Sequence, residues 1–210
     1  MRLLPSGERA VLVEVADLDE VMALAGPVRT LAGVEDVVPG ERTLLISVSD
    51  PADLAAVRVA LAEVASHPLP GPAQARTVEI PVVYDGPDLA DVAAHTGLTV
   101  AEVIDAHTSS PWRVGFGGFA PGFAYLVGGD PRLEVPRRGE PRPSVPAGAV
   151  GLAGRYSGIY PRSSPGGWQL IGHTDAVLFD VGTEPPALLG PGMTVRFVAS
   201  TSSEGTGPHG

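Results

Sequence analysis

From about residue 108 onwards, the sequence combines short apolar runs with closely spaced glycines and prolines and has no helical periodicity. A helix does not tolerate this density of Gly and Pro, because proline lacks a backbone donor and glycine weakens helical segments. Short strands joined by tight turns do tolerate it. The runs that we expect to be strands are Trp112–Phe116, Val145–Ala153, Gln169–Ile171, Ala176–Val181 and Thr194–Val198. This succession predicts an all-β barrel or sandwich.

The composition excludes several kinds of chemistry. Hydrophobic residues make up 44% of the chain and charged residues 18%, which suits a folded core despite 27 Gly and 22 Pro in 210 residues. Cysteine is absent, so disulfides, thiolate metal sites and a cysteine nucleophile are excluded. All 14 basic residues are arginine, so a Schiff-base lysine and a Walker-type lysine are excluded as well.

The net charge of −10 opposes non-specific binding to nucleic acid or to anionic membranes. There is no apolar run of about 18 residues, and the N-terminus lacks a basic-then-apolar signal pattern. We therefore expect a cytoplasmic protein with neither nucleic-acid nor membrane partners.

The first half of the chain predicts a small α+β module. Asp17 with Glu20, and Asp50 with Pro51, are typical helix starts. Pro39-Gly40 predicts a hairpin turn. The expected elements are strands at 10–15, 35–38, 43–48 and 77–83, and helices at 17–31 and 51–65. The order βαββαβ predicts a ferredoxin-like module over residues 1–83.

The remaining segments complete the predicted organisation. Residues 66–75 are rich in Pro and predict a connection, while Asp88–His95 and Thr99–His107 have helical spacing. These short helices lead into a mainly-β domain over residues 84–199. The small polar tail, residues 200–210, is expected to be disordered.

Charge is distributed unevenly along the chain. Residues 1–105 carry 17 acidic side chains and 6 arginines, whereas residues 112–162 carry 7 arginines and 3 acidic side chains. A basic, turn-rich segment in an acidic chain predicts a site for a small carboxylate or phosphate anion. The alternative is that these arginines pair with the acidic first half or with a partner chain.

The segment GFGGFAPGFAYL, residues 115–126, contains glycines spaced as in a dinucleotide-binding loop. That loop requires a helix directly after it, and here Pro121-Gly122 follows instead. We therefore reject dinucleotide binding. Ser157 lacks the G-x-S-x-G spacing of a nucleophilic serine, and the five histidines are too scattered to predict a metal site.

Aromatic residues in this region lie next to glycine turns, at Phe116, Phe119, Phe123, Tyr125, Tyr156, Tyr160 and Trp168. One interpretation is that the rings form a barrel core with its turns. The other is a cleft with aromatic walls and exposed backbone N–H groups, edged by arginine.

Residues Ile80–Thr174 resemble a known family. The matching pieces are IPVVY (80–84), GPDL (86–89), EVIDAHTSS (102–110), GFAPGFAYL (118–126), PRRGEPRPSVPAG (136–148) and SGIYPRSSPGGWQLIGHT (157–174). They are similar to the family that holds the B subunit of 5-oxoprolinase, the kinase inhibitor KipI and the first subunit of allophanate hydrolase/urea carboxylase. Residues 1–75 match only in the order of their elements.

The resemblance implies a ferredoxin-like module followed by a mainly-β cyclophilin-like barrel. It also implies a companion C subunit of the KipA or allophanate hydrolase subunit 2 type, and in the oxoprolinase members a third, A-type subunit. The implied activity is ATP-dependent hydrolysis of 5-oxoproline to L-glutamate by the complex, with this chain inactive alone. The sequence leaves open which subunit holds the ATP site. Inhibition of a sensor histidine kinase and the urea carboxylase reaction stay open as alternatives.

The sequence departs from the family pattern near the predicted site, at Gly129, Tyr156-Ser157, His173 and Asp175. The identity of the substrate is therefore the expectation that these departures affect most.

Phosphorylation of a lactam oxygen needs cations around the developing charge and a positioned carbonyl. Arg137, Arg138 and Arg142 are the predicted cations, with Arg137 and Arg142 as catalytic candidates. His107 is the candidate proton carrier, and the alternative is a histidine that caps a helix C-terminus. The predicted substrate-binding residues are Phe119, Pro121, Gly122, Phe123, Tyr125, Gly158, Tyr160, Pro165, Gly166 and Gly167. No metal ligand is predicted.

Overall fold

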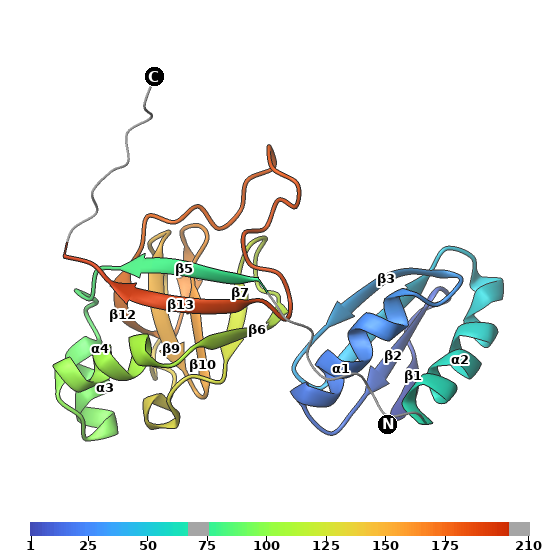
Figure 1. Cartoon of the computed structure of the whole chain (residues 1–210), viewed down its shortest axis with the longest axis horizontal. Coiled ribbons are helices and arrows are strands. Elements are labelled where there is room, and N and C mark those ends of the chain that lie inside the picture. The colour runs from blue at the N-terminus through green and yellow to red at the C-terminus, as the bar shows by residue number, and fades with distance from the viewer. Residues whose placement is uncertain (67–75, 202–210) are drawn as a thin grey trace. The chain divides into compact units, whose positions relative to one another are not determined.

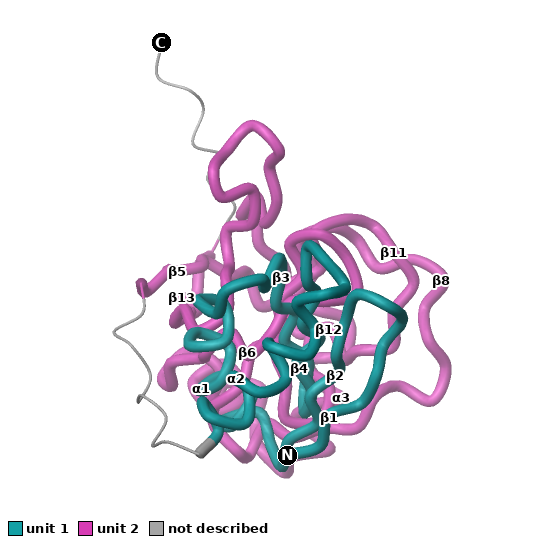
Figure 2. Tube along the Cα trace, turned by 90° about the vertical axis from the view of Figure 1, so that its right-hand side faces the viewer, with its two compact units in different colours: residues 1–75 teal, residues 76–210 magenta. Residues whose placement is uncertain are grey.

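A computed structural model describes residues 1–66 and 76–201 of the chain (Figure 1). The chain divides into two compact units, Met1–Ala75 and Arg76–Gly210 (Figure 2). The connection expected at 66–75 and the tail expected at 200–210 lie almost entirely outside the described residues.

Unit 1 is a four-stranded antiparallel sheet with two helices. The strands are β1 (Arg2–Pro5), β2 (Ala10–Glu14), β3 (Val34–Pro39) and β4 (Thr43–Val48), in the order β1-β2-β4-β3. The two helices, α1 (Leu18–Arg29) and α2 (Leu54–Ser66, after a 3-10 turn at Pro51–Asp53), contact each other and the sheet. Alternate strand residues such as Val11, Val13 and Ile46 are fully buried, as expected for a sheet with one covered face.

The predicted helix starts of unit 1 are confirmed. The Asp17 carboxylate accepts a hydrogen bond from the Glu20 N–H at 2.9 Å, and Glu20 Oε2 accepts one from the Ala16 N–H. Asp50 accepts from the Ala52 N–H at 2.9 Å in the same way. Local capping chemistry therefore fixes where both helical segments begin.

The ferredoxin-like order is not confirmed. The strand predicted at 77–83 forms as β5 (Thr77–Val82), but it pairs in parallel with β13 (Thr194–Ala199) in unit 2. The fourth strand of the unit 1 sheet is β1, which the sequence pattern did not predict. Its four residues are too short a segment to show alternation clearly.

Unit 2 is built on a seven-stranded, nearly closed sheet. Its order is β12-β9-β10-β7-β6-β13-β5, with β6 at Trp112–Gly117, β7 at Ala124–Val127, β9 at Ala149–Ala153, β10 at Tyr156–Ile159 and β12 at Gln169–His173. The two end strands meet just after β5, where Val83 and His173 exchange backbone hydrogen bonds of 2.9 Å. The predicted barrel-like architecture is thus observed for unit 2.

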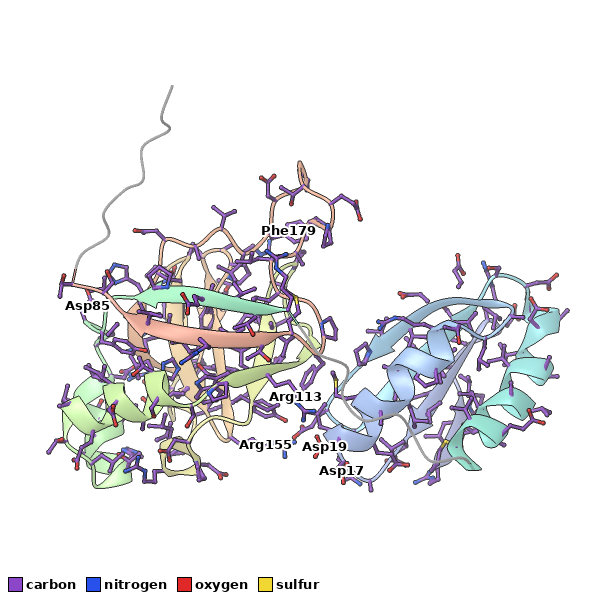
Figure 3. All side chains as sticks on the ribbon, viewed as in Figure 1. Asp17, Asp19, Asp85, Arg113, Arg155 and Phe179 are labelled. Carbon is purple, nitrogen blue, oxygen red and sulfur yellow. The ribbon has the colours of Figure 1, made fainter. Side chains whose placement is uncertain are left out.

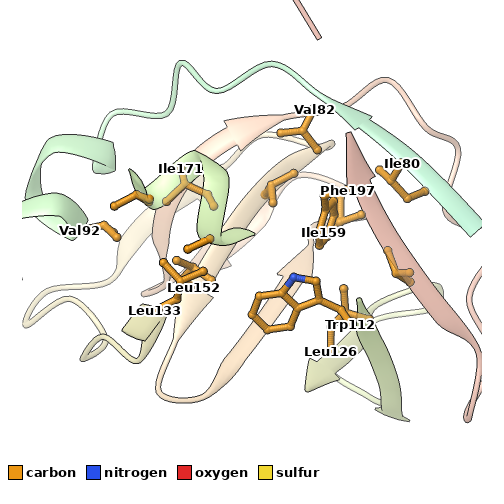
Figure 4. Close-up of a cluster of buried hydrophobic side chains, with 14 of the residues drawn as sticks. Ile80, Val82, Val92, Trp112, Leu126, Leu133, Leu152, Ile159, Ile171 and Phe197 are labelled. Carbon is orange, nitrogen blue, oxygen red and sulfur yellow. The ribbon is translucent and has the colours of Figure 1, made fainter. Parts of the chain in front are cut away.

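Side chains from all around the sheet fill the centre of unit 2 (Figure 4). Trp112, Leu126 and Phe197 are each at most 2% exposed there. Two helices, α3 (Leu89–Thr96) and α4 (Val100–Ser109), add Val92 and Val103 to the same cluster. Burial of this apolar surface is the main stabilisation of the unit.

Two strand predictions were wrong. Residues 145–153 form two strands, because the chain turns at Gly148, whose φ is +79°, between β8 (Arg142–Val145) and β9. Residues 176–181 are not a strand but part of the long loop between β12 and β13, where Phe179 makes one isolated bridge with Ala187 (Figure 3).

Over residues 1–66 and 76–201, no helix is long and apolar enough to cross a membrane.

Candidate functional site

A second cluster of buried side chains lies on the opposite face of strand β9 from the barrel centre. Val150 and Leu152 belong to the central cluster, whereas Ala149 and Ala153 belong to the second one. Successive side chains of a strand point to opposite faces, so small residues on β9 leave room on the outer face for larger ones. The larger ones are the aromatic residues of the sequence prediction.

The rings of this aromatic cluster pack mostly edge to face. Phe123 contacts Tyr160 and Trp168, with ring centroids 5.6 and 5.5 Å apart and interplanar angles of 75° and 87°. Phe116 stacks on Tyr125 at 4.4 Å, and Tyr156 meets the edge of both. The rings therefore form a second packed cluster outside the barrel core, with one ring exposed, and the aromatic cleft stays a prediction.

The exposed ring is Phe119, which is 57% accessible and lies in the loop between β6 and β7. Its φ is +63°, and it is the one non-glycine residue with positive φ in the described part of the chain. The Ala120 N–H donates to the Gly118 carbonyl at 2.6 Å, which closes a γ-turn around Phe119. Backbone strain of this kind is found where a side chain must be held in a particular place.

Three of the predicted glycines make room for neighbouring groups. A Cβ at Gly158 would lie 3.0 Å from both Phe123 Cζ and Trp168 Cζ3, and one at Gly166 would collide with the Tyr160 ring. Gly122 has a φ of +82° and lies against Phe179. These glycines therefore let the rings and loops approach closely. Pro121 and Pro165 are exposed nearby.

The arginines predicted as cations are brought together by a buried carboxylate. Asp88, which is 1% exposed, accepts hydrogen bonds from Arg138 Nη1 and Arg142 Nη2, each at 2.7 Å from Oδ1. Arg137 is exposed next to them. Sequence reasoning missed Asp88 as a site residue, although it lies in the GPDL piece that carried the family resemblance.

The arginine group and the aromatic cluster adjoin. Gly166 pairs with Arg142 across the two-stranded sheet of β8 and β11 (Ser164–Gly166), and its other side faces Tyr160. The Gly167 carbonyl accepts from the Arg138 N–H at 2.8 Å. Burial raises the pKa of Tyr160, while the charges of Arg137 and Arg142 act in the opposite direction. The structure therefore brings the predicted cations and most of the predicted substrate-binding residues close together, and their role in binding stays a prediction.

His107 lies elsewhere, in the interior of unit 2. It is 0% exposed and its ring stacks on Phe197 at 4.2 Å. Nδ1 lies 2.7 Å from the Tyr84 hydroxyl and Nε2 lies 2.9 Å from Ser157 Oγ. Burial lowers the pKa of His107 to about 3, so the imidazole is neutral at physiological pH.

This environment bears on both sequence hypotheses for His107. The residue is in the last turn of α4, but both of its ring nitrogens bond to hydroxyl groups rather than to the final carbonyls of the helix. Ser157, which is also 0% exposed, is not accessible from solvent. The geometry favours a structural histidine, and its catalytic role stays a prediction.

Within the described ranges, no group of three or more His, Asp or Glu side chains is arranged to hold a metal ion. Among the described residues, the guanidinium groups beside Asp88 are candidate donors to a nucleotide phosphate or another small anion. Arg138 Nε and Arg142 Nη1 are buried and have no hydrogen-bond partner among residues 1–66 and 76–201. The side chains of Arg138 and Arg142 are 32% and 22% exposed, so their outer N–H groups could meet an oxyanion.

The chain is similar to known proteins over most of its length. The family model "Carboxyltransferase domain, subdomain C and D" matches residues 1–189. The chain is 42% identical to the B subunit of 5-oxoprolinase from Escherichia coli O157:H7 over 207 residues, which is 91% of this chain and 93% of that protein. It is 52% identical to the corresponding 5-oxoprolinase B subunit of Bacillus subtilis (strain 168) over 126 residues, which span about half of that relative (52%).

Among solved structures, that of TTHA0988 is similar over 92% of this chain, with a TM-score of 0.78 and 37% identity. The match covers 40% of the TTHA0988 chain, so that protein contains further polypeptide. The family match over most of the sequence and the near full-length relative lead to one conclusion. This chain belongs to the carboxyltransferase subdomain C and D family, the family that holds the B subunit of 5-oxoprolinase.

Proposed function

We propose that this chain is the B subunit of an ATP-dependent 5-oxoprolinase, which opens the lactam of 5-oxoproline to give L-glutamate. The observation that carries the proposal is the 42% identity to a 5-oxoprolinase B subunit over nearly the whole length of both chains. The complex would contain a companion C subunit together with an A-type subunit, and this chain would be inactive alone. The barrel of unit 2 would be of the cyclophilin-like type.

The chemistry fits a site made of arginine and aromatic residues. A lactam carbonyl is a poor electrophile, and transfer of the γ-phosphoryl group of ATP to its oxygen, with ADP as the leaving group, would open its carbon to attack by water. Cleavage of the ring C–N bond would then give an acyl phosphate, which a second water would hydrolyse to glutamate and phosphate. Phosphoryl transfer is catalysed mainly by positioning and by cations near the developing charge. Arg137 and Arg142 would supply that charge on this chain, which has no lysine to do so.

The aromatic cluster would bind the ring of the substrate. Phe119 is exposed at the loop tip, and its ring lies 5.3 Å from that of Phe123 and 6.0 Å from that of Tyr160. A five-membered lactam has two apolar faces, so an exposed aromatic ring beside cations suits it. The ATP site would be in, or shared with, a partner subunit.

The proposal is tested by co-expressing the chain with its companion subunits and measuring 5-oxoproline consumption with and without ATP. We expect ATP-dependent release of glutamate by the complex and none by the chain alone. Arg142→Ala should lower kcat/KM by about 100-fold, the usual loss when one donor to a developing oxyanion is removed. Arg137→Ala should lower it as well.

The matched control is Arg132→Ala. Arg132 is bound to Asp130 at 2.6 Å and lies near Glu102 and Asp105, apart from the Asp88 group. Its loss removes the same charge and should leave turnover unchanged. A complex that never consumes 5-oxoproline would contradict the proposal. Inhibition of a sensor kinase, or urea carboxylation with a biotin carrier, would then identify the alternative.

A further inference from the structure

Asp88 is hydrogen-bonded directly to β12, one of the two end strands that meet to close the barrel. Its backbone N–H donates to the Leu170 carbonyl at 3.0 Å, and its Oδ2 accepts from the Leu170 N–H at 2.7 Å. Gly86 permits this approach, since a Cβ there would collide with the backbone of Leu170 and Ile171. Asp88 is therefore held against β12 by hydrogen bonds of both its backbone and its side chain.

The side chain of Asp88 does not do what an aspartate at this position ordinarily does. Asp88 is the N-cap residue of α3, where a carboxylate usually accepts from the first free N–H groups of the helix. No such bond is made. Instead, Oδ1 accepts from Arg138 and Arg142 at 2.7 Å each. The carboxylate therefore binds two guanidinium groups and does not cap the helix.

The charge at this site is not balanced. Burial alone would raise the pKa of Asp88, but hydrogen bonds from Arg142 and Leu170 and the charges of both arginines lower it overall. Asp88 is therefore ionised, and one carboxylate faces two guanidinium groups with a net charge of +1. Arg138 and Arg142 are 32% and 22% exposed, so their outer edges are accessible.

Each of the two arginines also has one N–H donor that no described residue accepts. Arg142 Nη1 and Arg138 Nε are buried without a hydrogen-bond partner in the described part of the chain. A second guanidinium on the same carboxylate adds a desolvation cost beyond that of a single ion pair. Two guanidinium groups on one carboxylate form a preorganised fork for a second oxyanion.

We infer that Asp88 is a positioning residue, which fixes Arg138 and Arg142 so that they bind an oxyanion of the reaction. The oxyanion is either the substrate carboxylate or the transferred phosphoryl group. The inference rests on the proposed function and adds to it the residue that orients the cations.

The test is Asp88→Asn in the assembled complex, because this change keeps the shape of the side chain and removes the charge. KM for 5-oxoproline and KM for ATP are measured separately. We expect one of them to rise at least tenfold, 5-oxoproline if the arginines bind the carboxylate and ATP if they bind the phosphoryl group. Asp88→Glu should recover part of the loss, since the longer carboxylate still reaches the arginines.

The control is Asp130→Asn, which breaks the exposed pair with Arg132 and should change neither KM. A structural role alone would reduce the folded fraction, so kcat would fall with both KM values unchanged. That result would overturn the inference.

If the wild-type complex shows no turnover, the proposed function fails, and binding decides the inference independently. Calorimetric titration of the full chain with inorganic phosphate and with 5-oxoproline should then show binding of one of them. Asp88→Asn should weaken that binding at least tenfold, and Asp130→Asn should not. Absence of binding to the wild-type chain, or equal binding by both variants, would refute the positioning role.

Discussion

The phenol oxygen of Tyr84 lies 2.7 Å from Nδ1 of His107, so both ring nitrogens of this fully buried histidine are hydrogen-bonded to neutral hydroxyl groups. Neither ring nitrogen bonds to a carboxylate that could stabilise a positive charge, in contrast to the histidine of a nucleophilic serine site. Burial also raises the pKa of Tyr84, which stays protonated. The Tyr84–His107–Ser157 group is therefore an uncharged network inside the barrel.

This network should make the stability of the protein pH-dependent. The pKa of His107 is about 3 in the folded chain, whereas an unfolded histidine titrates near its ordinary value of 6.5. As the pH falls below 6.5, His107 becomes protonated in the unfolded chain but stays neutral in the folded chain, so the folded state loses stability. The loss from this group is about 1.4 kcal/mol at pH 5.5 relative to pH 8.

Urea unfolding of the wild type and of His107→Gln at the two pH values measures this loss. The variant has no titrating ring, so its free energy of unfolding should lack this part of the pH dependence. Equal pH slopes in the two proteins would show that His107 is not buried in its neutral form.

Ser157→Ala should weaken the fold without removing activity. The substitution leaves Nε2 of His107 without its hydrogen-bond partner, which costs about 1–3 kcal/mol for a buried group. Because Ser157 Oγ is inaccessible, turnover per folded complex should stay within about twofold of the wild type. Chemical unfolding together with active-site-normalised turnover tests both statements. A stable but inactive variant would contradict the structural role of Ser157.

Phe119 allows its backbone strain to be separated from the contribution of its ring. Phe119→Ala and Phe119→Gly both remove the ring, but only glycine adopts a φ of +63° without steric cost. The glycine variant should therefore be more stable than the alanine variant by about 1 kcal/mol. Both should raise KM for 5-oxoproline to a similar extent. Equal stability would mean that the γ-turn relaxes when the ring is absent.

Much of the fold could be predicted from the sequence because its signals are local. Capping residues such as Asp17 and Thr99 mark helix starts whose side-chain bonds are observed, and glycine turns mark the barrel strands. The strand with which β5 pairs could not be predicted in this way. Its parallel pairing with β13 joins segments more than 100 residues apart, and nothing in the alternation of Thr77–Val82 specifies the partner.

The sequence predicted which residue types form the candidate site, but it predicted less of how they are arranged in space. The arginines and the rings were identified from a basic, aromatic, glycine-rich segment, and they do lie together. Asp88 was missed because it lies 50 residues before Arg138 and precedes a helix, where an aspartate is typical of a simple cap. His107 was singled out by its motif, and the sequence did not show that the barrel would enclose it.

Gly166 should be essential for the shape of the site. A Cβ at this position would collide with the ring and hydroxyl of Tyr160, which is itself 2% exposed and packed against Phe123 and Trp168. Gly166→Ala must therefore displace either Tyr160 or the β11 backbone opposite Arg142. Overpacking of this kind costs about 1–3 kcal/mol, and KM for 5-oxoproline should rise with it.

Gly190→Ala, outside the predicted site, is the matched control. A Cβ there would lie 3.5 Å from Met193 Sδ, which is an ordinary contact, and neither Gly166 nor Gly190 has a positive φ. Its thermal midpoint and KM should remain close to those of the wild type. If both variants behaved alike, the contact of Gly166 with Tyr160 would have no part in holding the arginine and aromatic groups together.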